Sequence, residues 1–323
     1  MAPFEYRRAG GVEEVLAQLG RPGLRLLAGG TTLVDLMKLG VETPATVLDI
    51  SALALDGIAV EDGWLRIGAL ATNTDVAQHA LVQAHAGLVS KAILSGASGQ
   101  IRNVATIGGN LLQRTRCVYF RGTDWRCNKR SPGAGCSAID GLHPGHAVLG
   151  TSAACHAVHP SDLAVALLAA DAQVHVRSLR GVRRIPFDAF YVLPGATPQI
   201  EHALAEDELI THLSLPVTGA APRSDYLKLR GRASYEFATV SVAASLRMHG
   251  GQVAEVAVAL GGVGTVPWRM RSAEALLHGQ PLTDAALDAF CDALLDTAVA
   301  TEQNRYKLAM ARAAVCRVLG GLQ

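Results

Sequence analysis

The spacing of hydrophobic residues predicts alternating strands and helices at the start of the chain. Short apolar runs next to glycine or proline indicate strands, and apolar residues three and four positions apart indicate helices. In residues 1–50 these patterns alternate strand, helix, strand, helix, strand, over Phe4–Arg8, Val12–Leu19, Leu24–Ala28, Thr32–Leu39 and Thr46–Ile50. The chain therefore begins as an α/β unit.

A long irregular segment interrupts the pattern further on. From Gln113 to about Leu149 the periodicity is lost, and loops of this length are uncommon unless they are functional. We interpret residues 96–110 as a glycine-rich loop and the segment with Pro186, Pro194 and Pro198 as an extended connector. Around them, strands are predicted at Leu65–Leu70 and Ala172–Val176. Helices are predicted from Asn73 or Thr74 onward, at Gly87–Ser95 and at Asp162–Ala170.

The last hundred residues favour a separate domain made of a sheet and packed helices. A boundary is expected near Pro216–Pro222. Strands are predicted at Tyr226–Arg230, Ala238–Arg247 and Val253–Gly261, and helices at Ala273–Leu277, Asp284–Ala300 and Gln303–Leu319.

Composition narrows the class of protein. Hydrophobic residues make up 50% of the 323 residues and charged residues 18%, as in a folded protein. A net charge of +1 provides no broad field for nucleic acid or an anionic membrane. We see no apolar stretch long enough to span a bilayer, and Met1–Tyr6 lacks the apolar core of a signal peptide. We expect no nucleic-acid binding, no membrane insertion and no export signal in this chain.

Two glycine loops are candidates for binding a diphosphate. Leu26–Leu33 runs from a strand through two glycines into a helix with hydroxyl residues at its start, and Gly99–Leu111 is a second such loop. Glycines let the backbone approach a ligand, and the first amides of a helix are free to bind an anion. Ordinary glycine turns without a ligand are the alternative, because the spacing is not that of a Rossmann fingerprint.

Four of the six cysteines are candidates for holding a metal or cluster. Cys117, Cys127, Cys136 and Cys155 are separated by 9, 8 and 18 residues, which matches neither tandem zinc motifs nor the common ferredoxin run. Spacing alone therefore does not identify the metal, and a four-cysteine zinc site remains an alternative. Cys291 and Cys316 are expected to be inert members of helices. Four nearby histidines could replace a cysteine, but loop histidines are more often solvated or bonded to backbone, so we leave them out of the ligand set: His143, His146, His156 and His159.

The glycine loops resemble those of a known family. Ala28-Gly29-Gly30-Thr31, Gln100-Ile101-Arg102-Asn103 and Ala105-Thr106-Ile107-Gly108-Gly109-Asn110 are similar to the paired loops of the molybdopterin dehydrogenase FAD-binding family, of the xanthine dehydrogenase type. The resemblance implies an α+β fold with a two-part N-terminal FAD-binding domain (FAD-binding type 2, PCMH-like) and a C-terminal α+β domain of the CO dehydrogenase flavoprotein type. The implied bounds are 1–218, with subdomains 1–52 and 53–218 and a cysteine-rich loop at 113–155, and 219–323.

The same resemblance implies an FAD site and no catalytic residue in this chain. Asp162 would hold the ribityl or diphosphate end, Leu209 and Ile210 would touch the adenine or the flavin, and Lys228 would reach the isoalloxazine edge. Without the family, Asp162 is a helix-capping acid and Lys228 a strand lysine. The full implied set is Leu26, Leu27, Ala28, Gly29, Gly30, Thr31, Thr32, Leu33, Ala105, Thr106, Gly109, Asn110, Asp162, Leu209, Ile210 and Lys228.

The cysteine loop resembles one subtype, the FAD subunit of aldehyde oxidoreductases that some bacteria export to the periplasm. This similarity implies a [4Fe–4S] cluster on the four clustered cysteines. Basic neighbours would offset the negative charge of the cluster, and they are Arg114, Arg116, Arg121, Arg126, Lys129 and Arg130.

The resemblance implies an electron-transfer role within a heterotrimer. Its partners would be a molybdopterin-binding large subunit and a [2Fe–2S] small subunit, and electrons would pass from the partner clusters to FAD and an external acceptor. An aldehyde oxidised to a carboxylic acid is the implied substrate. The location would be periplasmic by co-export with a signal-bearing partner, or cytoplasmic. Two alternatives are a self-contained FAD-dependent oxidase or reductase, and a non-enzymatic iron–sulfur or zinc module.

Overall fold

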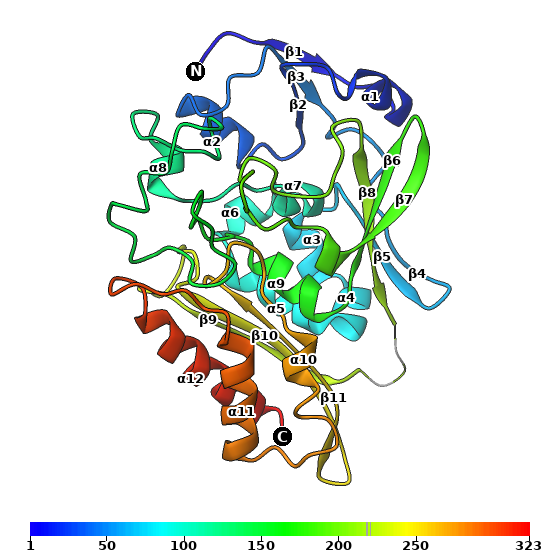
Figure 1. Cartoon of the computed structure of the whole chain (residues 1–323). Helices are drawn as coiled ribbons and strands as arrows, with labels where there is room; N and C mark the ends of the chain where they lie inside the picture. The colour runs from blue at the N-terminus through cyan, green and yellow to red at the C-terminus, as the bar shows by residue number, and fades with distance from the viewer. Residues whose placement is uncertain (218, 220) are drawn as a thin grey trace.

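The computed structural model describes residues 1–217, 219 and 221–323, and it contains three sheets arranged in sequence order (Figure 1). The first is parallel, in the order β1 (Glu5–Arg8), β3 (Thr46–Asp49), β2 (Leu24–Leu27). Parallel strands need crossover connections. Here α1 (Val12–Gln18) lies in the connection from β1 to β2, and α2 (Leu33–Lys38) lies in the connection from β2 to β3. The predicted α/β start is confirmed.

The second sheet is antiparallel and has five strands. In spatial order they are β4 (Ile58–Glu61), β5 (Trp64–Gly68), β8 (Leu209–Pro216), β6 (Gln173–Ser178) and β7 (Gly181–Pro186). Three of these strands, β4, β7 and β8, were not predicted from the sequence. Strand β8 is central and buried on both faces along much of its length, so its apolar residues do not alternate. Strand β7 contains Pro186, which an edge strand tolerates because one row of its hydrogen-bonding groups is unpaired.

Short helices follow β5 and carry the second glycine loop. The helices are α3 (Asn73–Gln78), α4 (Ala80–His85), α5 (Gly87–Ser95), α6 (Gly99–Arg102) and α7 (Ile107–Leu111). Our interpretation of residues 96–110 as one open loop was wrong, because α6 and α7 each form a single capped turn. The Ser98 hydroxyl accepts from the amide of Ile101, and the Thr106 hydroxyl accepts from the amide of Gly109.

The third sheet is antiparallel, in the order β11 (Gln252–Gly261), β10 (Val240–His249), β9 (Arg223–Leu229). Helix α12 (Tyr306–Gly321) packs on β10 and contacts α11 (Asp284–Leu295), while α10 (Arg271–Glu274) contacts α11 and β11. On the other side, α5 and α9 (Asp162–Ala169) contact strands of this sheet. One hydrophobic core is thus shared between the second and third sheets.

Residues 113–149 contain one short helix, α8 (Val118–Arg121), as expected for an irregular segment. Hydrogen bonds from side chains, rather than a hydrogen-bond ladder between strands, organise this segment. The Arg130 guanidinium donates to the carbonyls of Tyr119 and Phe120 at 2.9 and 2.7 Å. Cys127 and Cys136 lie opposite each other in an isolated antiparallel bridge. The loop lies beside α2 and above the third sheet (Figure 1).

Candidate functional site

The two glycine loops touch each other. A Cβ atom on Gly29 would lie 2.0 Å from the carbonyl oxygen of Val104, so only glycine permits this approach. Gly30 has a φ of 69°, in the left-handed region that glycine adopts without strain. The strand-to-helix turn after β2 is therefore held directly against the turn between α6 and α7.

A cavity of about 610 Å³ opens along these loops, and we call it the glycine-loop cavity. Its volume is typical of a site for a sizeable small molecule. Eleven of the residues predicted for FAD line it: Leu26, Ala28, Gly29, Gly30, Thr31, Thr32, Leu33, Thr106, Gly109, Leu209 and Ile210.

The other five predicted residues lie outside this lining: Leu27, Ala105, Asn110, Asp162 and Lys228. The opposite wall comes from a segment that the sequence did not single out, including His202, Leu204 and Glu206. The pairing of β8 with β5 and β6 places the start of β8, and the segment before it, beside the loops. No local motif could have revealed it.

Asp162 and Lys228 form a buried ion pair. The Lys228 ammonium lies 2.7 Å from Oδ2 of Asp162, and the two side chains are 4% and 10% exposed. Tyr226 donates to Oδ1 of Asp162 at 2.6 Å, and burial beside this carboxylate raises the pKa of the tyrosine. The helix cap is Ser161, which accepts from the amide of Ala164, so the alternative of Asp162 as the capping residue was wrong. Asp162 lines the central cavity described next, whereas Lys228 does not, so Lys228 contacts that cavity only through its ion pair with Asp162 among the residues described.

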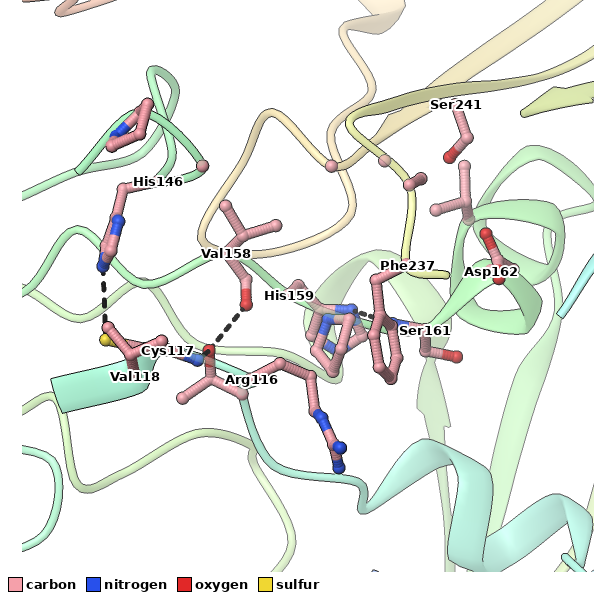
Figure 2. Close-up of a pocket in the computed structure, with 18 of the residues that line it drawn as sticks. Arg116, Cys117, Val118, His146, Val158, His159, Ser161, Asp162, Phe237 and Ser241 are labelled. Carbon is pink, nitrogen blue, oxygen red and sulfur yellow. Dashed lines mark hydrogen bonds between the residues drawn. The ribbon is translucent and has the colours of Figure 1, made fainter. Parts of the chain in front are cut away.

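A second cavity, of about 350 Å³, lies between the cysteine loop, the start of α9 and the third sheet (Figure 2). We call it the central cavity, and Asp162, Ser161 and Phe237 are in its lining. Ser161 donates to Oδ1 of Asn110 at 2.7 Å. Asn110 lies near the end of α7, and Gly108 and Gly109 of the same helix line the glycine-loop cavity. A ligand that follows α7 would therefore pass from one cavity toward the other.

The four clustered cysteines line a third, small cavity, which we call the cysteine cavity. All six cysteines are free of disulfides. Burial raises the pKa of Cys117 to about 11 and also raises that of Cys155, so without a metal both are protonated at neutral pH. The backbone amide of Ala157 donates to the Cys155 sulfur at 3.4 Å. Cys117 also lines the central cavity, so the two cavities share a wall.

The cysteines are not arranged around a single ion. Within the described residues, no three or more His, Cys, Asp or Glu side chains are grouped so that they could hold one metal ion. Four thiolates bound at about 2.3 Å to one zinc lie about 3.8 Å apart. The described cysteines therefore form no preformed site for a single ion.

Most of the basic side chains around the cysteines are paired with carboxylates. Arg114 lies 2.6 Å from Glu201 and 2.8 Å from Glu42, and Lys129 lies 2.9 Å from Glu201. Arg116 and Arg121 both contact Asp35 of α2. These pairs fasten the cysteine loop to its neighbours, and less positive charge is left for a cluster than the sequence indicated.

The remaining cysteines have a packing role. Cys291 is fully buried between α11 and α12, and burial raises its pKa to about 12. Such a thiol is a poor nucleophile at neutral pH.

In the part of the chain that the structure describes, no helix has the length and apolar character needed to cross a bilayer.

Comparison with known proteins matches almost the whole chain. Residues 2–218 match the family described as FAD binding domain in molybdopterin dehydrogenase, and residues 225–321 match the CO dehydrogenase flavoprotein C-terminal domain. The aldehyde oxidoreductase FAD-binding subunit PaoB of Escherichia coli K12 is 46% identical over 99% of this chain and 98% of its own length. The xanthine dehydrogenase FAD-binding subunit of Escherichia coli O157:H7 is 28% identical over 90% of this chain and 84% of its own.

A solved structure has the same fold. A chain of carbon monoxide dehydrogenase from Hydrogenophaga pseudoflava superimposes with a TM-score of 0.78 at 28% identity, covering 100% of this chain and 98% of that one.

Proposed function

Because the chain belongs to the family of FAD-binding domains of molybdopterin dehydrogenases, we propose that it is the electron-transfer subunit of a heteromeric aldehyde oxidoreductase. It is an oxidoreductase FAD subunit of the molybdenum hydroxylase type. The aldehyde substrate is supported by one observation above all, the 46% identity to an aldehyde oxidoreductase subunit along 99% of the chain.

The glycine-loop cavity has the chemistry that FAD requires. Gly29 and Gly30 let the backbone approach the diphosphate, and backbone amides of the turn between β2 and α2 would donate to it. Leu209 and Ile210 provide apolar contact for a ring. Once bound, FAD supplies reversible redox chemistry that no side chain of this protein can provide.

We place the flavin end of the cofactor toward Asp162. Ser161, in the lining of the central cavity, donates to Asn110, which lies in the same short helix as Gly108 and Gly109 of the glycine-loop cavity. Lys228 and Tyr226 fix the Asp162 carboxylate from behind, so this carboxylate cannot swing away when a polar group of the cofactor approaches. The roles of Asp162 and Lys228 are thus to position one another as well as the ligand.

We propose that Cys117, Cys127, Cys136 and Cys155 hold a [4Fe–4S] cluster. The support is that all four cysteines line one cavity. In a cubane each thiolate binds a different iron atom, so its ligands lie farther apart than those of a single ion. Ligation would also remove the protons that buried Cys117 and Cys155 otherwise keep. The cluster would supply one-electron transfer beside the central cavity.

The partners of the proposed complex are a molybdopterin-binding large subunit and a [2Fe–2S] small subunit. Support comes from the names of relatives, which include an FAD-binding subunit of xanthine dehydrogenase and the medium chain of carbon monoxide dehydrogenase. The division of this chain into a FAD-binding domain, residues 1–218, and a C-terminal domain, residues 219–323, is part of the same proposal.

Metal and flavin analysis of the purified chain tests the cofactor content. We expect one FAD and about four iron atoms with equal labile sulfide, and an EPR signal after reduction. Cys127→Ser should lower iron and sulfide together and expose the loop to protease, while FAD stays bound. Cys316→Ser is the matched control and should change neither. Zinc at one ion per chain, without an EPR signal, would refute the cluster.

A further inference from the structure

The side chain of His146 contacts Cys117, one of the proposed cluster ligands, and the proposed function gives this histidine no role. His146 is buried, and its Nε2 atom lies 3.2 Å from the Cys117 sulfur (Figure 2). The contact joins two parts of the cysteine loop 29 residues apart in sequence. Both residues also line the central cavity, so the contact lies in the wall between the cluster and the proposed flavin end.

The chemistry of an iron-bound thiolate fixes the direction of this hydrogen bond. A ligating sulfur carries no proton and can only accept, so the imidazole must present N–H and not its lone pair. This places the proton of the neutral ring on Nε2. A hydrogen bond to a cluster sulfur stabilises the reduced state, which carries one more negative charge, and therefore raises the reduction potential.

We propose that His146 donates a hydrogen bond from Nε2 to the Cys117 sulfur and raises the reduction potential of the cluster. The proposal rests on the [4Fe–4S] site proposed above. Among the described residues, His146 provides the one side-chain hydrogen bond to any of the four sulfurs. The Cys117 sulfur also accepts from the backbone amides of Tyr119 and Phe120, and the Cys155 sulfur accepts from that of Ala157. It is a positioning and tuning residue, not a ligand.

Redox titration of the assembled complex, followed by EPR of this cluster, tests the proposal. His146→Met removes the N–H donor with little change in side-chain length, and His146→Gln keeps one. We expect the midpoint potential to become more negative in His146→Met and to stay close to that of the wild type in His146→Gln. His156→Met is the control, because the His156 ring is half-buried in the same loop and, unlike His146, forms no hydrogen bond with a cysteine sulfur among the described residues.

Iron and sulfide are measured on the same samples. Equal midpoint potentials in the wild type, His146→Met and His146→Gln, at full iron content, would overturn the role of His146. Loss of the cluster in His146→Met alone, with a normal potential in His146→Gln, would support the donor. A wild-type protein without iron would instead overturn the cluster site itself, and metal analysis alone reveals that failure.

Discussion

At the scale of single residues, the cofactor site depends on how closely two backbone turns approach each other. Gly29 is in contact with the peptide of Val104, and a side chain at this position would occupy the space of the Val104 carbonyl group. Backbone on both sides leaves no flexible group to move aside. The position therefore controls both the packing of the loops and the shape of the diphosphate site.

We predict that Gly29→Ala lowers FAD affinity by roughly tenfold or more, equivalent to about 1.4 kcal/mol or more, because the two turns must separate. The FAD that each variant retains is measured as flavin absorbance after gel filtration. Gly99→Ala is the control, since a Cβ there meets no atom within 4 Å. Equal FAD retention in both variants would show that the loops do not bind the diphosphate.

At the scale of elements, helix α12 is joined to the cysteine loop by a buried lysine. Lys307 is 1% exposed, and its ammonium donates to the carbonyls of Gly145 and Gly262, both at 2.8 Å. No carboxylate among the described residues forms an ion pair with it. Burial lowers the pKa of Lys307 to about 8, so its charge is costly to keep in the folded state.

This burial predicts that stability depends on pH in a definite direction. Between pH 8 and 10.5 the unfolded chain binds more protons at Lys307 than the folded chain does, so the contribution of this residue to stability rises with pH. Below pH 8 that contribution is constant and at its lowest. Relative to Lys307→Met, the wild type should gain roughly 3 kcal/mol across this range, at about 1.4 kcal/mol per pH unit.

Urea denaturation of both proteins at pH 7.5 and pH 10 measures the effect, because titrations common to the two cancel in the difference. Lys38→Met, at an exposed position, is the control. An unfolding free energy of the wild type minus that of Lys307→Met that stays constant or falls from pH 7.5 to pH 10 would contradict the predicted cost of the buried charge.

At the scale of the whole molecule, the cysteine loop is the segment that contacts all three sheet units. Arg116 and Arg121 join it to Asp35 on α2, Lys129 joins it to Glu201 before β8, and Lys307 joins it to α12. Its cavity adjoins the central cavity, which the third sheet also lines. The proposed cluster and the proposed flavin end would therefore lie side by side.

We predict that the purified chain with FAD does not oxidise aldehydes, whereas the complex assembled with its partner subunits does. Removing this subunit from the complex should change which external acceptors are reduced. Steady-state assays with an aldehyde and several acceptors, with and without the subunit, provide the measurement. Full turnover by the isolated chain would favour a self-contained flavin oxidase.

The sequence by itself determined what depends on neighbouring residues. Apolar periodicity located the α/β start, helices such as Gly87–Ser95 and Asp162–Ala169, and the strands of the third sheet to within about three residues. Glycine and hydroxyl patterns indicated the two loops, and clustering indicated the four cysteines. Strands β4, β7 and β8 were missed. Strand β8 pairs with the distant strands β5 and β6, whereas β4 and β7 pair with their neighbours in sequence across tight turns.

Only the tertiary structure decided which of these residues act together. It paired Lys228 with Asp162, engaged Arg114 and Arg116 with carboxylates, and placed His146 against Cys117. It also set Gly29 against Val104. These contacts join residues far apart along the chain, and they form because burial of the shared cores fixes the positions of whole elements. No spacing of residues along the sequence records that geometry.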